Sequence, residues 1–161
     1  MIGKHLKHNL SKRGYTVWYA TGGKYEINGK TTMQYDLVNQ IDAYDLFSVI
    51  EPEYVFNLAG YNGNISFSQK YQADIFFKTS QIALNCLHYA QQAGVKKCVN
   101  ILSSCAIADL GDKKLKAEEL WNGPPNQTIE AHGFAKRVWD AYSRQLYKQH
   151  GFNSVCAIVN N

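Results

Sequence analysis

Two short segments carry side chains that could perform acid–base chemistry on a small molecule. The first is Leu102-Ser-Ser-Cys105, which ends an apolar run and so places two hydroxyls and a thiol at the carboxyl end of a predicted strand. Open α/β sheets bind their ligands at that end of the strands, which makes Ser103 and Cys105 candidates for contact with a substrate. The alternative is that the serines only cap the next helix.

The second segment is the start of the last long helix, where His132 and Lys136 are four residues apart and point the same way. A basic side chain beside an acid–base group changes the pKa of that group. We expect Lys136 to keep His132 neutral at pH 7, because a like charge disfavours imidazolium. The alternative is that both side chains are exposed on a solvated first turn.

Three further segments could hold a nucleotide cofactor. Gly3 opens the first predicted helix, where the last glycine of a dinucleotide-binding turn lets helix and strand pack closely, although it could also be an incidental glycine. Asp36 and Leu37 follow at the distance expected for a turn that contacts the nucleotide. The run Leu58-Ala-Gly60 is either a tight strand exit or a surface that lets a flat cofactor approach the backbone.

The elements that must position these residues alternate between strands and helices. Three of the four strand-like runs are almost continuously apolar, which predicts strands buried on both faces of a parallel sheet. These runs are 15–19, 53–59, 97–103 and 153–159. Helical patterns cover a segment that ends at Gly14, 41–50 before Pro52, 73–93 before Gly94, a short stretch near 116–120, and 134–149. The alternation predicts one α/β domain over 1–161, a Rossmann-like doubly wound parallel sheet.

Composition narrows the class of protein. An apolar content of 45% over 161 residues excludes a disordered chain, and the scattered net charge of +4 suits an anionic small molecule as well as a nucleic acid. No apolar run reaches the roughly eighteen residues of a membrane span, and the first residues do not read as a signal peptide. The four cysteines fit no zinc spacing, so we predict reduced thiols, no metal site and a cytoplasmic protein.

Together the segments resemble the extended short-chain dehydrogenase/reductase superfamily, and within it the GDP-L-fucose synthase family. The resemblance covers nearly the whole chain. Its specific motifs are Ser103-Ser-Cys105 and Asn122-Gly-Pro-Pro-Asn126. The motifs shared with many sugar-nucleotide epimerases and dehydratases are Met1-Ile-Gly3, Asp36-Leu-Val-Asn39, Pro52 with Val55 and Asn57-Leu-Ala59, Ala73-Asp74 with Phe77, Ala135-Lys-Arg137 and Asn161.

The resemblance implies a role for each candidate. Ser103 would orient the substrate carbonyl, Cys105 would serve as an acid/base in epimerisation, and Lys136 would bind the nicotinamide ribose. His132 stands at the position of the catalytic tyrosine of the family, so it is the candidate proton donor here. The remaining cofactor-binding residues that the resemblance and the strand pattern indicate are Gly3, Asp36, Leu37, Leu58, Ala59, Gly60, Leu102 and Asn161.

The chain departs from the family pattern in three places. His132 replaces the tyrosine whose pKa the neighbouring lysine lowers. The first strand, which the family places between strands 2 and 4, and most of its glycine loop have no counterpart, and neither has the part after Asn161 that carries a further histidine and most of the sugar-binding domain. Because unpaired buried backbone in the middle of a sheet is costly, we expect either that another segment fills the place of the first strand or that the chain is part of a longer protein.

The predicted function is that of a sugar-nucleotide epimerase/reductase, which would convert GDP-4-keto-6-deoxymannose to GDP-L-fucose with NADPH. The alternative is a catalytically impaired nucleotide-binding or assembly module. NADP(H) is favoured over NAD(H) because Tyr19-Ala-Thr21 holds no acid for the ribose hydroxyls and Lys24 is close by for a 2′-phosphate. Expected partners are a nucleotide-sugar substrate and a second copy bound through helices 73–93 and 134–149, with no nucleic acid and no membrane.

Overall fold

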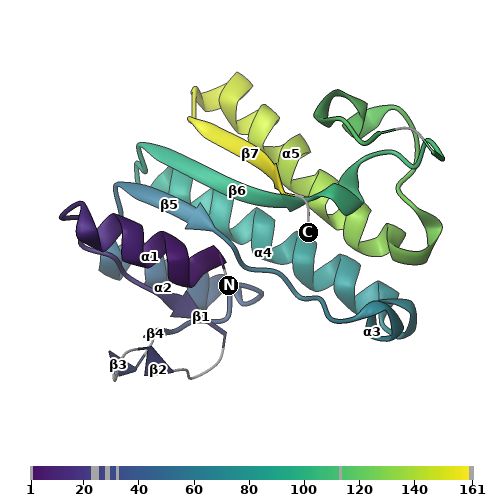
Figure 1. The fold of residues 1–161 in the computed structure, drawn as a ribbon. Helices are drawn as coiled ribbons and strands as arrows, with labels where there is room; N and C mark the ends of the chain where they lie inside the picture. The colour runs from purple at the N-terminus through teal and green to yellow at the C-terminus, as the bar shows by residue number, and fades with distance from the viewer. Residues whose placement is uncertain (1, 23–25, 28–29, 32, 113, 160–161) are drawn as a thin grey trace.

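The computed structural model describes residues 2–22, 26–27, 30–31, 33–112 and 114–159, which form an α/β fold (Figure 1). The helices are α1 (Ile2–Lys12), α2 (Gln40–Ile50), α3 (Ile65–Lys70), α4 (Gln72–Gln92) and α5 (Glu130–His150). The strands are β1 (Ala20–Thr21), β2 (Glu26–Ile27), β3 (Lys30–Thr31), β4 (Met33–Gln34), β5 (Tyr54–Asn57), β6 (Lys97–Ser103) and β7 (Ser154–Val159). Three 3₁₀ turns, η1 (Ser104–Ala106), η2 (Ala117–Trp121) and η3 (Gln127–Ile129), lie between β6 and α5.

The parallel strands form two separate ladders. β5, β6 and β7 pair in that order, with Val55 opposite Cys98 and Cys98 opposite Ser154. β1 pairs in parallel with β4, and β2 pairs with β3 in an antiparallel hairpin. Within the described residues no strand joins β1 to β5, so no other segment takes the place of the first strand.

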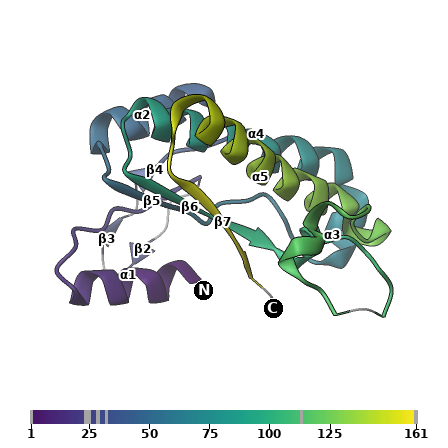
Figure 2. The same cartoon turned by 90° about the horizontal axis from the view of Figure 1, so that it is seen from above.

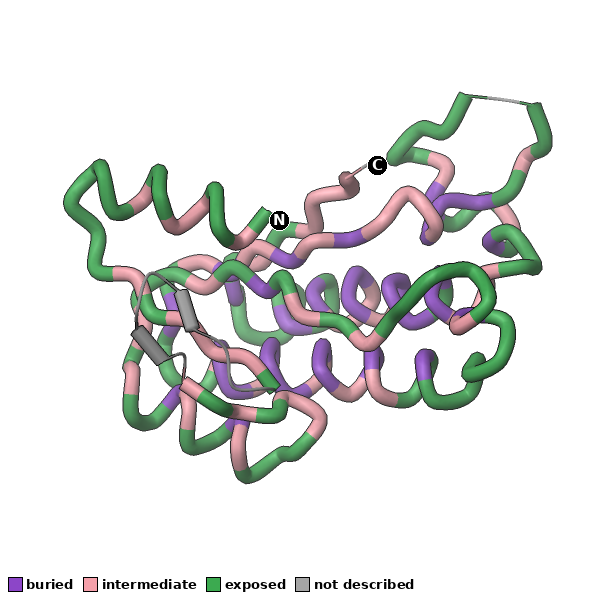
Figure 3. The backbone as a smooth tube through the Cα atoms, turned by 60° about the horizontal axis from the view of Figure 1, so that its bottom comes forward, coloured by how far each residue is buried: buried purple, intermediate pink, exposed green. Residues whose placement is uncertain are grey.

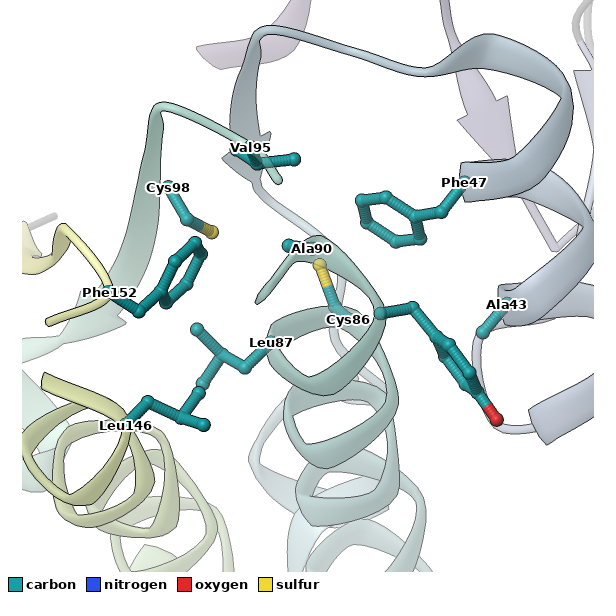
Figure 4. Close-up of a cluster of buried hydrophobic side chains, with 10 residues drawn as sticks. Ala43, Phe47, Cys86, Leu87, Ala90, Val95, Cys98, Leu146 and Phe152 are labelled. Carbon is teal, nitrogen blue, oxygen red and sulfur yellow. The ribbon is translucent and has the colours of Figure 1, made fainter. Parts of the chain in front are cut away.

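Helices α2, α4 and α5 cover one face of the β5–β6–β7 sheet, and α1 lies on the other side (Figure 2). The main core is between the sheet and those three helices, and the buried residues follow the inner sides of α4 and α5 (Figure 3). A close-up of this core shows side chains from α2, α4, α5 and β6 converging on one another (Figure 4). The residues of this cluster are Ala43, Phe47, Cys86, Leu87, Tyr89, Ala90, Val95, Cys98, Leu146 and Phe152.

The expectation of strands buried on both faces is wrong for the face that lies away from these helices. Along β6, every second residue is buried, including Asn100 and Leu102, whereas the residues between them are only half-buried. On the neighbouring strands Tyr54, Phe56 and Val155 are exposed. The reason is that α1, the helix on this side, has no buried residue and covers little of the sheet.

The helix boundaries match their sequence signals better than the strands do. Gly14 and Gly94 adopt φ angles of +84° and +69° directly after α1 and α4, a conformation that favours glycine and ends a helix. The predicted strand 15–19 is wrong: its residues form no strand, and the ladder begins at Ala20, opposite Met33, whose amide donates to the Tyr19 carbonyl at 3.2 Å. α5 begins at Glu130, four residues before the predicted start.

Candidate functional site

The end of β6 carries the predicted hydroxyl and thiol. β6 ends at Ser103, and the chain turns at once into η1, which contains Cys105. The Cys105 amide donates to Ser103 Oγ at 3.3 Å, so the serine does cap the turn. Because Oγ is the acceptor in that bond, the hydroxyl hydrogen remains available for a substrate oxygen. The capping and substrate-contact interpretations of Ser103 are therefore compatible.

Helix α5 packs against this turn at Gly133. A Cβ added to Gly133 would lie 2.5 Å from the Cys105 carbonyl oxygen and 2.6 Å from Pro125 Cβ. Neither a backbone carbonyl nor a proline ring can move aside easily, so only glycine permits this approach. The close contact brings α5, the β6 turn and the Asn122–Asn126 loop together.

His132, one residue before that glycine, is 8% exposed and its Nδ1 has no hydrogen-bond partner within the described residues. Burial, followed by the charge of Lys136, lowers the pKa of His132 from 6.5 to about 4. The interpretation of an exposed, solvated histidine is therefore wrong. The expected neutrality at pH 7 agrees with this pKa, although burial is a larger cause than the lysine.

Lys136 is also buried, at 6% exposure, and reaches back to β6. Its Nζ donates to the Ile101 carbonyl at 2.8 Å and lies 3.4 Å from the centre of the Trp139 ring. Burial lowers the pKa of Lys136 to about 7, so that the amine is only partly charged at neutral pH.

A cavity of about 240 Å³ opens beside η1. Its polar lining comes from Ser104, Cys105, Asp109 and Asn126, and its apolar lining from Ile107, Ala108, Leu115 and Ile129. The Asn126 amide donates to Asp109 Oδ2 at 2.7 Å, which ties the two sides of the loop together. Asp109 and Asn126 are not among the predicted site residues. The Asn122-Gly-Pro-Pro-Asn126 motif was the sequence signal that could have indicated them.

The predicted cofactor residues of β5 lie close to Lys136. A Cβ at Gly60 would be 3.9 Å from Lys136 Nζ, an ordinary contact distance, so the amine lies beside the Gly60 backbone. Asn57 is 3% exposed, and its Oδ1 accepts from the Ala59 amide at 3.2 Å, which makes a tight strand exit. The buried Nδ2 of Asn57 has no partner within the described residues, so the end of β5 carries a hydrogen-bond donor that is not satisfied.

The other cofactor candidates lie at the same end of the strands or outside the described residues. Asp36 Oδ1 accepts from the Val38 amide at 3.0 Å, and the Leu37 carbonyl accepts from an asparagine of α4 at 2.8 Å. A Cβ at Gly3 would lie 3.3 Å from Leu58 Cδ1, so α1 begins against the β5 exit. Leu102 is 1% exposed and its side chain packs in the core. Asn161 and Lys24 lie outside the described residues.

Within the described residues there is neither a cluster of metal-binding side chains nor a helix that could span a membrane. Across the residues that the structure describes, no three histidine, cysteine or acidic side chains gather where they could hold a metal ion. Over the same residues, none of the helices combines the length and the apolar character that crossing a membrane requires. What the site does combine is a hydroxyl donor, a thiol and a neutral imidazole around one strand end, a set of groups suited to proton transfer next to a carbonyl.

The sequence was compared with protein families and with known proteins. The profile of the NAD dependent epimerase/dehydratase family matches residues 1–161. The chain is 29% identical over 126 residues to GDP-L-fucose synthase of Dictyostelium discoideum, covering 78% of this chain and 39% of that protein. It is 27% identical over 162 residues to GDP-L-fucose synthase 1 of Arabidopsis thaliana, covering 100% of this chain and 47% of that protein.

A solved structure shares the fold over almost the whole chain. It is a GDP-mannoheptose C4 reductase from Campylobacter jejuni with NADP bound, with a TM-score of 0.83 and 28% identity over 99% of this chain and 48% of that one. This chain therefore spans less than half the length of these relatives.

Proposed function

Because the chain belongs to the NAD dependent epimerase/dehydratase family, we propose that it acts as a sugar-nucleotide epimerase/reductase of the GDP-L-fucose synthase type. Its substrate is GDP-4-keto-6-deoxymannose and its product is GDP-L-fucose. One observation carries the proposal: Ser103 and Cys105 lie at one strand end, on a turn against which α5 packs at Gly133, and Cys105 lines the adjoining cavity. The protein works in the cytoplasm on a soluble nucleotide sugar.

The proposed chemistry begins with a proton transfer. The Ser103 hydroxyl donates a hydrogen bond to the 4-keto oxygen, which stabilises the enolate that forms when the C–H proton beside the carbonyl is removed. Cys105, as thiolate, accepts that proton and becomes a thiol. Solvent then supplies a proton to the opposite face of the carbon, which inverts its configuration, and the Cys105 thiol releases its proton to solvent.

The reduction that follows requires NADPH, which supplies a hydride to the carbonyl carbon when it is bound. The residues present fit its nicotinamide end: Lys136 Nζ lies beside the Gly60 backbone, and Asn57 Nδ2 is a buried donor without a described partner. NADP(H) is preferred to NAD(H) because β1 ends at Thr21 and neither that residue nor the following Gly22 is an acid for the ribose hydroxyls. Gly3, Asp36 and Leu37 are the proposed contacts of the remainder of the cofactor.

His132 is the proposed proton donor for the reduced oxygen, and its neutrality limits the rate. A neutral imidazole is a far poorer acid than imidazolium, and acid catalysis contributes roughly 10²–10⁴-fold to rate. With a pKa of about 4, His132 is almost entirely neutral at pH 7. Reduction is therefore slow at neutral pH, whereas the proton transfer at Cys105 does not depend on His132.

The test is deuterium incorporation into the 4-keto sugar nucleotide in D₂O, followed by NMR without added NADPH. Exchange at the carbon beside the carbonyl in the presence of the protein, and its loss in Cys105→Ser and Ser103→Ala, supports the proposal. Leu115→Ala, which alters the apolar cavity wall and no proton-transfer group, is the matched control and should retain exchange. Absence of exchange with the parent protein would refute an epimerase.

A second candidate is a nucleotide-binding or assembly module that has lost catalysis. The observation in its favour is His132, which is buried and neutral at the position of the family tyrosine. This candidate predicts no deuterium exchange, together with calorimetric binding of GDP or of the GDP-sugar. Exchange above the uncatalysed rate excludes it.

A further inference from the structure

Arg137 is a buried charged residue for which the proposed chemistry has no use. It is 5% exposed, and its Nε donates to the Ala106 carbonyl at 2.7 Å. Ala106 is the last residue of η1, directly after Cys105, and is itself fully buried. A buried carbonyl without a partner is destabilising, so this bond matters for the conformation of the turn.

The guanidinium is held in place by aromatic neighbours. Its Cζ lies 5.5 Å from the ring centres of Trp121 and Phe134. Trp121 is fixed in turn, because its Nε1 donates to Asp140 Oδ2 at 2.8 Å. Arg137 therefore presents Nε to the turn from a fixed place on α5, one helical turn after the Gly133 contact.

The η1 turn is consequently held on both sides of Cys105. Ser103 Oγ accepts from the Cys105 amide before it, and Arg137 donates to the carbonyl of the residue after it. We propose that Arg137 is a positioning residue, which holds the η1 turn so that the Cys105 thiol stays in register with the Ser103 hydroxyl. The proposal rests on the proposed function in that Cys105 is the acid/base; Arg137 itself touches no reacting atom.

Two substitutions of equal length separate the hydrogen bond from the bulk of the side chain. In Arg137→Gln the amide nitrogen comes at the same place along the side chain as Arg Nε, so a donor to Ala106 remains. In Arg137→Met that place is taken by a methyl group that cannot donate. Lys148→Met is the control, because Lys148 lies exposed near the end of the same helix, away from the turn.

The measurement is the rate of alkylation of each cysteine by iodoacetamide, resolved by peptide mass spectrometry over a range of pH. Loss of the hydrogen bond to Ala106 in Arg137→Met should raise the alkylation rate of Cys105 by about fivefold or more, since alkylation depends on access to the thiol. Cys156, half-buried on β7, serves as the internal reference and should not change. Arg137→Gln and Lys148→Met should stay within about twofold of the parent, because both retain the N–H donor to Ala106.

Three results would overturn the proposal: an unchanged Cys105 rate in Arg137→Met, a parallel rise of Cys105 and Cys156, or an equal rise in Arg137→Gln. If Arg137→Met does not fold, as the absence of a cooperative unfolding transition would show, NMR of the parent protein tests the proposal instead. There the Arg137 Nε–H should exchange with solvent at least about tenfold more slowly than that of exposed Arg13, and equal rates would refute the bond. Alkylation needs no substrate, so failure of the deuterium assay leaves this result standing.

Discussion

His132 should make the protein less stable as the pH falls from 7 to 5. In the unfolded chain its pKa is the ordinary value near 6.5, whereas in the folded protein burial and Lys136 lower the pKa to about 4. Between these values the unfolded state binds the extra proton, so acid favours unfolding. The contribution of His132 to stability is complete above the unfolded pKa and is lost progressively as the pH falls toward 4.

The size of the effect follows from those two pKa values. Each pKa unit is about 1.4 kcal/mol, and at pH 5 an unfolded histidine is almost fully protonated while the folded one is about one-tenth protonated. The expected loss between pH 7 and pH 5 is roughly 2 kcal/mol in the free energy of unfolding. A change of this size is easily measured against a total stability of about 5–15 kcal/mol.

The assay is urea unfolding of the parent and of His132→Gln at pH 7, 6 and 5. Other groups titrate in both proteins, so the quantity to follow is the difference in unfolding free energy between them. In Lys136→Met most of the pH dependence should remain, because burial is the larger cause of the lowered pKa. A difference between parent and His132→Gln that stays constant within about 0.5 kcal/mol over this range would show that His132 is not buried in the neutral form.

Four further expectations concern packing, Lys136, assembly and cofactor. Gly133→Ala should destabilise the protein by about 1–3 kcal/mol in urea unfolding, whereas Gly123→Ala, whose Cβ would meet Ala108 at 3.5 Å, should be nearly neutral. Because burial lowers the pKa of Lys136 to about 7, stability should rise by about 2 kcal/mol from pH 7 to pH 9 in the parent relative to Lys136→Met. Light scattering should give a dimer through α4 and α5, whose Phe76, Phe77 and Tyr147 are exposed, and a strictly monomeric mass would count against it. Calorimetry should show tighter binding of NADPH than of NADH, because neither Thr21 nor the following Gly22 is an acid for the ribose hydroxyls.

The parts of the fold that could be predicted are those determined by residues close together in the sequence. Gly14 and Gly94 end helices through their own backbone conformation, and the apolar runs of β6 and β7 need no distant partner to be recognised. The segment 15–19 has a strand-like composition, yet a strand also needs a neighbour, and only its last residue meets one, where the Tyr19 carbonyl accepts from the Met33 amide at 3.2 Å. A strand-like composition shows where a strand could form, but a strand forms only where a second strand pairs with it.

In the candidate site, too, the features that depend on local sequence could be predicted and those that depend on distant residues could not. Ser103 and Cys105 could be placed at a strand end because that position follows from local pattern. The burial of His132 could not be predicted, because it depends on Gly133 meeting Pro125 and the Cys105 carbonyl, groups that are distant in the sequence or belong to another element. The role of Arg137 was hidden for the same reason, since its partner Ala106 lies 31 residues earlier.

The break between the two parallel ladders divides the protein into parts of unequal stability. α1 buries no side chain and is tied to the following segment by a 3.4 Å bond from Tyr19 Oη to the Gly3 carbonyl, whereas the β5–β6–β7 layer is backed by the main core. Segments with few buried contacts open at low free energy, independently of global unfolding. Limited proteolysis should therefore cut first beside the exposed Lys12 and Arg13, and should leave the layer that carries Ser103 and Cys105 intact.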